Sequence, residues 1–126
     1  MKLAKAISPK FKELMIKLIN AEVPMKTAVK IKKVSEFLDE KLTNYETARV
    51  DLIKKYADLD ENGDIIVDSD NNATFSSQES RIEFAKELSE LVSVDLEIKK
   101  IPIEELGDNI SLSTTDLIIL EDIIDF

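Results

Sequence analysis

The chain has 126 residues, no cysteine, no histidine and only two glycines, and its net charge is −9. These counts exclude a disulfide framework, a thiolate metal site, a histidine general base and a glycine-rich phosphate loop. A hydrophobic share of 44% is sufficient for a core without such supports, so we expect residues 1–126 to form a single domain.

Charge is distributed unevenly along the chain. Residues 1–33 hold nine lysines and two glutamates, a net of +7, whereas the remainder holds eight basic and 24 acidic residues, a net of −16. Such a chain can pair its charges within the fold, associate head to tail, or offer each end to a different partner. We do not expect direct nucleic-acid binding, because the basic segment has no arginine and one aromatic residue, Phe11.

No apolar run approaches the roughly 20 residues that a membrane-spanning helix requires. The lysine-bearing N-terminal segment also lacks the apolar core of a signal peptide. We therefore expect no membrane partner.

The N-terminal half predicts a helical hairpin over residues 1–58. Residues 1–7 alternate loosely and indicate a short edge strand or an extended lead-in. Ser8-Pro9 combines a hydroxyl cap with proline at the first helical position, and it begins a helix ending near residues 20–22. Pro24 follows a very short connection, so the next helix should return antiparallel to the first. The apolar face of the first helix comprises Phe11, Leu14, Met15, Leu18 and Ile19.

A long amphipathic helix is expected from about Met25 to Asp58, without internal glycine or proline. Its seam residues recur every seven positions over about four heptads and are Ile31, Leu38, Tyr45 and Leu52. At roughly 1.5 Å per residue this helix would be on the order of 50 Å long, more than a domain of this size needs for its own core. We therefore expect part of the seam to pack against another polypeptide.

Residues 59–126 predict a β-hairpin, a helix, a later strand and a short C-terminal helix. The hairpin strands are residues 65–67 and 73–75, flanking a polar turn. Ser76 and Glu79 form a capping box that begins a helix ending near Val92. Residues 94–98 then alternate as a strand, and Ser113 with Asp116 caps a helix from 114 to 124. No internal repeat is evident.

The predicted fold class is therefore α+β and helix-dominated. It has an N-terminal αα-hairpin with a long central helix, a small antiparallel β-sheet made of the hairpin plus one later strand, and a short C-terminal helix.

The segment from residue 58 to 65 resembles part of a calcium-binding EF-hand loop. Asp58, Asp60, Asn62 and Asp64 would supply oxygens, but Ser69 occupies the twelfth position, where a bidentate carboxylate is needed. We interpret the segment as a helix stop and turn, for which these residue types are also favoured. A calcium site at these four residues is the alternative, and no other metal or cofactor is predicted.

We predict no catalytic residues. Paired carboxylates occur at 68/70, 104/105 and 121/122, but the members of each pair should lie together in solvated turns or helix ends. Acid–base catalysis requires two carboxyl groups in different environments around a pocket. The sequence therefore predicts that the protein is not an enzyme.

The C-terminal segment, residues 117–126, is apolar on nearly every side and requires burial on more than one face. Two interpretations stay open, because the segment can pack into its own core or dock on a partner or sister subunit. Its candidate contact residues are Leu117, Leu120, Ile124 and Phe126.

Several short motifs occur together in order along the chain. They are Pro24-Met25-Lys26-Thr27-Ala28, the run Glu46–Tyr56 with Arg49, Leu52 and Lys55-Tyr56, Asp60-Glu61-Asn62-Gly63, Glu83-Phe84 and Leu120-Glu121. In this arrangement the sequence resembles a family of small, uncharacterised proteins of tailed bacteriophages and prophages. The resemblance implies a phage origin, no assigned chemistry, and a location in the host cytoplasm or the virion.

Taken together, these features predict a non-enzymatic phage protein that acts through protein–protein contacts as a small virion or assembly component. Its partners would be further copies of itself or other phage proteins. One alternative is an acidic inhibitor of a host nucleic-acid-binding enzyme, and another is a calcium-binding module. The predicted partner-binding residues are Ile31, Leu38, Tyr45, Leu52, Leu117, Leu120, Ile124 and Phe126.

Overall fold

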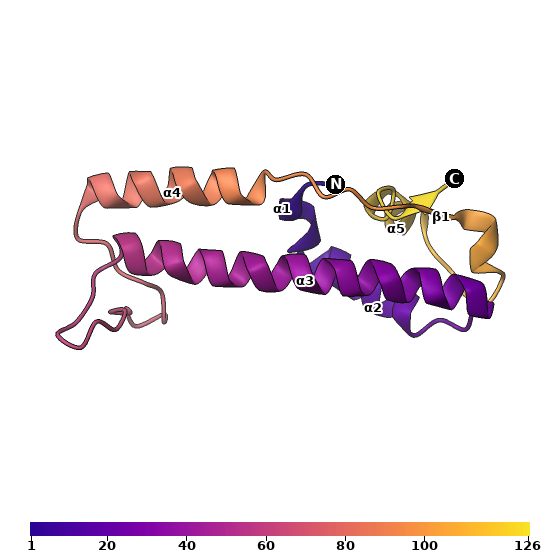
Figure 1. The fold of residues 1–126 in the computed structure, drawn as a ribbon, viewed down its shortest axis with the longest axis horizontal. Coiled ribbons are helices and arrows are strands. Elements are labelled where there is room, and N and C mark those ends of the chain that lie inside the picture. The colour runs from indigo at the N-terminus through magenta and orange to yellow at the C-terminus, as the bar shows by residue number, and fades with distance from the viewer. The chain divides into compact units, whose positions relative to one another are not determined.

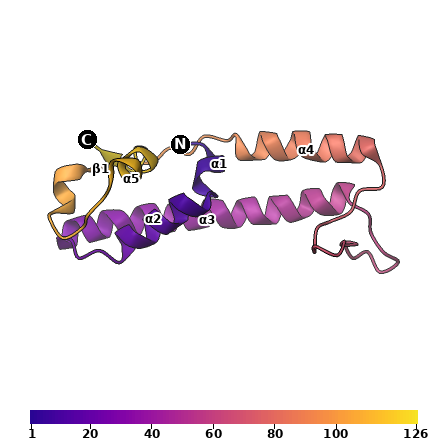
Figure 2. The same cartoon turned by 180° about the vertical axis from the view of Figure 1, so that it is seen from behind.

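The computed structural model describes all 126 residues and contains five α-helices, one 3-10 helix and one two-stranded sheet (Figures 1 and 2). The chain divides into two compact units, which we describe separately. Unit 1 comprises residues 1–42 and 95–126, and unit 2 comprises residues 43–94. Helix α3 (Met25–Tyr56) supplies residues to both. None of the helices has the length and apolar character needed to cross a bilayer.

Unit 1 begins with the helices α1 (Leu3–Ala6) and α2 (Pro9–Ile19). The predicted start of α2 is confirmed, because the Ser8 hydroxyl accepts a hydrogen bond from the Phe11 N–H at 3.3 Å. The strand or extended lead-in expected over residues 1–7 is wrong for residues 3–6. Leu3 and Ala6 are both buried, at a helical spacing of three, and only Lys2 makes an isolated antiparallel bridge, to Asp95.

The structure contains one sheet, and it is parallel. Strands β1 (Ile101–Pro102) and β2 (Ile124–Asp125) have two residues each. The predicted antiparallel sheet of a hairpin and a later strand is therefore wrong. Helix α5 (Thr114–Ile119) ends before the predicted Ile124, and the chain turns so that the Ile123 carbonyl accepts a 2.8 Å hydrogen bond from Ile101. Isoleucines, branched at Cβ, favour this extended conformation.

The core of the molecule lies entirely in unit 1. Sixteen residues are buried, and every one falls within residues 1–42 or 95–126. The only buried polar residue, Thr27, donates a 2.7 Å hydrogen bond to the carbonyl of Glu105, in the 3-10 helix η1 (Ile103–Leu106). The buried apolar residues are Leu3, Ala6, Phe11, Leu14, Met15, Leu18, Ile31, Val34, Leu38, Leu96, Ile101, Leu106, Leu120, Ile123 and Ile124.

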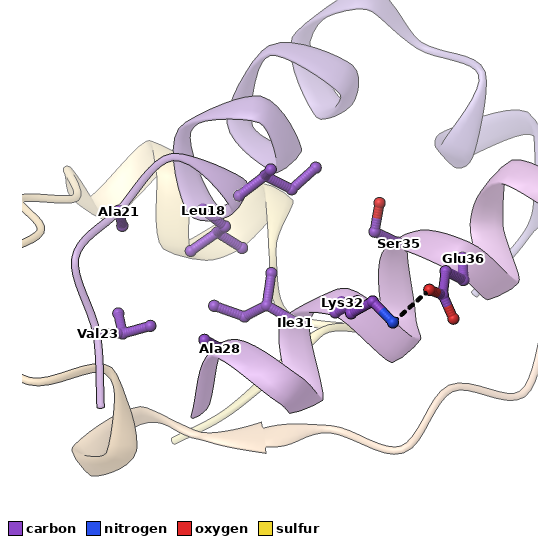
Figure 3. A pocket seen from close by; sticks show the side chains of 9 residues that line it. Leu18, Ala21, Val23, Ala28, Ile31, Lys32, Ser35 and Glu36 are labelled. Atoms are coloured by element: carbon purple, nitrogen blue, oxygen red, sulfur yellow. Dashed lines mark ion pairs between the residues drawn. The ribbon is translucent and has the colours of Figure 1, made fainter. Parts of the chain in front are cut away.

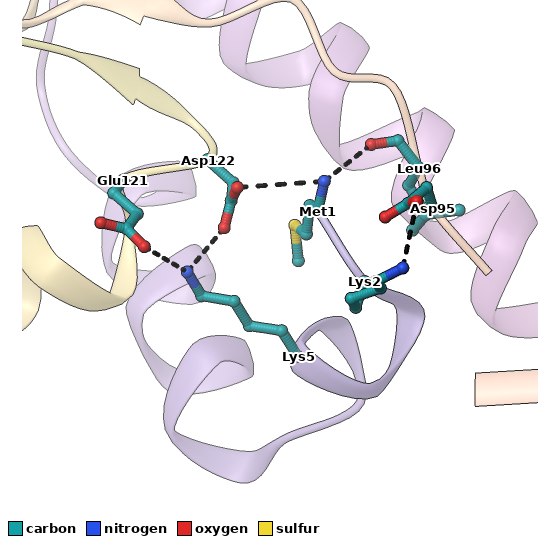
Figure 4. Close-up of polar contacts among 7 residues, drawn as sticks. All are labelled: Met1, Lys2, Lys5, Asp95, Leu96, Glu121 and Asp122. Atoms are coloured by element: carbon teal, nitrogen blue, oxygen red, sulfur yellow. Dashed lines mark hydrogen bonds and ion pairs between the residues drawn. The ribbon is translucent and has the colours of Figure 1, made fainter. Parts of the chain in front are cut away.

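A cluster of charged contacts joins the two segments of unit 1 (Figure 4). The Lys5 ammonium lies 2.6 Å from the Asp122 carboxylate, and Lys2 lies 3.1 Å from Asp95. The Lys5 hydrogen bond holds the pKa of Asp122 below its ordinary value of 3.8, although partial burial opposes this shift. Part of the positive charge of residues 1–33 is thus neutralised by C-terminal carboxylates.

Unit 2 contains the C-terminal part of α3 and the helix α4 (Gln78–Val92), which lie alongside each other (Figures 1 and 2). Lys55 and Glu87 form an ion pair at 3.3 Å between the two helices. Helix α4 ends at the predicted Val92, but its cap is Ser77 rather than Ser76. No residue of unit 2 is buried, because two helices alone cannot enclose a core.

The β-hairpin predicted at residues 65–75 has no regular strands, and its turn, residues 68–72, is one of two similar five-residue loops, of which the other is residues 60–64. The carboxylates of Asp60 and Asp68 each accept two backbone N–H bonds within their own loop, at 2.9 and 3.0 Å. Positive φ angles at Gly63 (80°) and Asn71 (64°) complete the turns. The connecting segments therefore pair only through isolated bridges, 59 with 65 and 67 with 73.

The Asp122 contact generates a stability prediction. Because the folded-state pKa of Asp122 lies below 3.8, its contribution is complete above about pH 4 and is lost as the pH falls through the folded value. Asp122→Asn should lower the free energy of unfolding at pH 7 by about 1 kcal/mol, because the negative charge that pairs with Lys5 is lost, although water partly screens this ion pair. Chemical denaturation of the unmodified chain and of Asp122→Asn at pH 7 and pH 3 measures the effect of the substitution and its decrease at acidic pH.

The matched control is Asp95→Asn, which removes a more exposed ion pair (Lys2 58%, Asp95 69% exposed). This variant should change stability less than Asp122→Asn at pH 7. Equal effects of the two substitutions would contradict the role assigned to the Lys5–Asp122 contact.

Candidate protein-binding site

An apolar groove runs between α2 and α3 in unit 1. One hollow of about 180 Å³ is bordered by Leu18, Ala28 and Ile31, with the Lys32–Glu36 ion pair at its margin (Figure 3). A second hollow of about 300 Å³ shares Ile19 and Ser35 with the first. The two hollows therefore adjoin each other along the helical hairpin.

The exposed apolar side chains beside this groove come from α2. Ile16 is 58% exposed and Ile19 is 50% exposed, although the opposite side of the same helix is buried. The helix is thus apolar over more of its circumference than its own unit covers. Sequence analysis assigned Ile19 to the buried face and did not single out Ile16. The sequence does indicate this second apolar side, because Met15, Ile16, Leu18 and Ile19 together cover more of the helix circumference than a single apolar stripe.

The second apolar surface is the helical face of unit 2, which we call the unit 2 seam. On α3 it includes Tyr45 and Leu52, and on α4 it includes Leu88 and Leu91, all of them half-buried. The rings of Phe75 and Phe84 lie 5.0 Å apart at the start of α4. Ile82 is 59% exposed. The seam therefore keeps its apolar side chains in partial contact with solvent along both helices.

The predicted partner-binding residues separate into two groups. Those covered within unit 1 are Ile31 and Leu38, each 4% exposed, with Leu120 and Ile124, each 0% exposed. The accessible group comprises the half-buried Tyr45, Leu52 and Leu117 and the 63% exposed Phe126. The structure does not bring the eight residues together on one surface. A role in partner binding stays a prediction for each of them.

The four residues of the calcium alternative lie in the first loop of unit 2. The Asp58 carboxylate accepts hydrogen bonds from the hydroxyls of Ser76 (2.6 Å) and Thr74 (3.1 Å), and the Ser76 hydroxyl is the main reason that its pKa is lowered. Asp60 accepts from the N–H groups of Asn62 and Asp64. No three carboxylates in the chain are grouped so that they could hold a metal ion. These carboxylates stabilise the loop itself.

Comparisons with protein-family models, with curated proteins and with solved structures found no match to this chain.

The loop geometry predicts the response to calcium. Because the Asp58 and Asp60 carboxylates are engaged within the loop, millimolar calcium should leave the midpoint of thermal unfolding unchanged. A specific site would raise this midpoint by mass action. The same titration with magnesium is the control for general ionic effects, and a rise with calcium alone would contradict the prediction.

Proposed function

We propose that this protein is non-enzymatic and acts through protein–protein contacts, associating with a second copy of itself through the unit 2 seam. The observation that carries the proposal is that all sixteen buried residues lie in unit 1 and none in unit 2. A pair of amphipathic helices buries its apolar stripes only when another layer covers them. A second copy supplies that layer, as in a four-helix arrangement.

The charge of unit 2 supports pairing between its helical parts. Residues 43–57 and 77–94 hold five basic and six acidic side chains, so the helices are nearly neutral. The other six acidic residues of unit 2 lie in the connection between the helices, with no lysine or arginine among them. Two copies of the seam can therefore approach without strong repulsion between like charges.

A seam that pairs with itself makes a contact in which both copies use the same surface. Such isologous contacts close into dimers and need no third molecule. In keeping with the phage resemblance, we place the protein among small virion or assembly components, where repeated protein–protein contacts are the activity. The host cytoplasm or the virion is the corresponding location.

The seam contact predicts the effect of Leu52→Glu. A charge in the middle of the seam should weaken self-association by at least about tenfold, because burying a leucine side chain contributes roughly 1.5–3 kcal/mol. Sedimentation velocity over a range of protein concentrations measures the association, and circular dichroism checks that the helices are retained.

Thr47→Glu provides the matched control, since it adds the same charge on the opposite, exposed face of α3. It should associate as the unmodified chain does. A chain that stays monomeric at all concentrations, or that responds equally to both substitutions, would contradict self-association through the seam.

A further inference from the structure

A second groove in unit 1 combines an apolar floor with a basic rim. It lies between α3 and residues 97–101 and has a volume of about 320 Å³. Its floor contains Val34, Phe37, Ile98 and Ile101. Its rim contains Lys30, Lys33, Lys99 and Lys100, with Glu97 as the only acidic residue. We call this surface the lysine groove.

Three of the four rim lysines form no ion pair, whereas most lysines of residues 1–33 do. Lys30 forms a 2.6 Å ion pair with Glu105. Lys33, Lys99 and Lys100 form no ion pair, and Lys33 and Lys99 are exposed. Ammonium groups without an ion-pair partner around an apolar floor suit a ligand with carboxylates beside apolar side chains.

We propose that the lysine groove binds the acidic loop, residues 58–70, of a second copy of the chain. Residues 58–70 hold six carboxylates and no lysine or arginine. The same connection exposes apolar side chains, with Leu59 43%, Ile66 42% and Val67 49% accessible. The acidic loop thus offers a complement to both parts of the groove: carboxylates for the basic rim and apolar side chains for the apolar floor.

The acidic loop is already ordered for such a contact. Asp58, Ile66 and Thr74 form a closed ring of backbone hydrogen bonds, in which each N–H donates to another member's carbonyl at 2.9–3.0 Å. Asp60 and Asp68 are engaged in closing their own turns, whereas Glu61 and Asp70 make no side-chain hydrogen bond or ion pair. A segment held in shape loses less conformational entropy on binding than a flexible one.

This contact extends the proposed self-association to a second pair of surfaces. Groove and loop are different surfaces, so their contact is heterologous and joins copies head to tail. It depends on the proposed function only in that the partner is again a copy of this chain. The two contacts can be tested separately, because the groove contact is electrostatic and the seam contact is apolar.

Two charge-reversed variants test the proposal. The groove variant carries Lys33→Glu and Lys99→Glu, and the loop variant carries Glu61→Lys and Asp70→Lys. In the groove variant both groove and loop are net negative, and in the loop variant the net charge of the loop falls from −6 to −2. When the two variants are mixed, the unmodified groove of the loop variant can bind the unmodified loop of the groove variant. Lys12→Glu with Lys26→Glu is the matched control, because both residues are exposed, form no ion pair and lie outside both the lysine groove and unit 2.

Sedimentation velocity in 50 mM and 1 M NaCl gives the readout, performed in the Leu52→Glu background as well as in the unmodified chain. We expect the unmodified chain and the control to show an association that weakens at least about tenfold in 1 M salt, where screening is nearly complete. Each charge-reversed variant alone should lose this association, and the equimolar mixture should regain it. Its persistence in the Leu52→Glu background would separate the groove contact from the seam contact.

Absence of a salt-sensitive association in the unmodified chain would overturn the proposal. Loss of this association in the groove variant but not in the loop variant would show that the acidic loop is not the occupant of the groove. Failure of the mixture to regain the association would also show that the acidic loop is not the occupant. Loss of all association in Leu52→Glu alone would show that the groove makes no contact of its own and would leave the seam contact standing.

Discussion

The interaction on which the rest of the structure depends is the burial of the C-terminal isoleucines within unit 1. Ile123 and Ile124 are completely inaccessible to solvent, and Ile124 is paired with the 1% exposed Ile101 in the parallel sheet. Because unit 1 consists of two segments separated by 52 residues of unit 2, its core forms only when residues 95–126 meet residues 1–42. The contacts of Lys5 with Asp122 and of Thr27 with the Glu105 carbonyl join the same two segments.

Because the core forms where residues 95–126 meet residues 1–42, the hydrophobic stabilisation is concentrated in unit 1. Helix α3 carries a single seam, yet Ile31 and Leu38 are covered whereas Tyr45 and Leu52 stay half-buried. The difference does not come from the helix itself, since the seven-residue spacing continues through both units. It comes from what the rest of the chain supplies: unit 1 places α2 and the C-terminal segment in the same core, and unit 2 supplies only α4. The free energy available from covering the second half of the seam is therefore not gained within the fold.

Local features of the sequence were sufficient to predict the starts of two helices, α2 and α5. Ser8 before Pro9 and the reciprocal capping of Ser113 and Asp116 depend on residues three positions apart, and both are observed. Strand pairing failed because it depends on distant partners: nothing near Ile124 indicates that Ile101 will lie beside it. The equivalent loops closed by Asp60 and Asp68 were missed as a repeat, because Asn71 replaces Gly63 at the positive-φ position. The seam residues were predicted by their period, but the lysine groove was not, because Lys33 and Lys99 meet only in the fold.

The pairing of charges also differs between unit 1 and unit 2. Within unit 1 the N-terminal lysines are opposed by the C-terminal carboxylates, so folding itself neutralises part of an uneven sequence. Unit 2 has five basic residues against twelve acidic ones, and no carboxylate of the acidic loop forms an ion pair. Asp60 and Asp68 accept hydrogen bonds within their own turns, and Asp58 accepts them from Thr74 and Ser76. An apolar seam gains from salts that strengthen burial, whereas a contact between lysines and carboxylates weakens in any salt. A chain with both surfaces can therefore assemble through contacts that respond in opposite directions to the same ionic conditions.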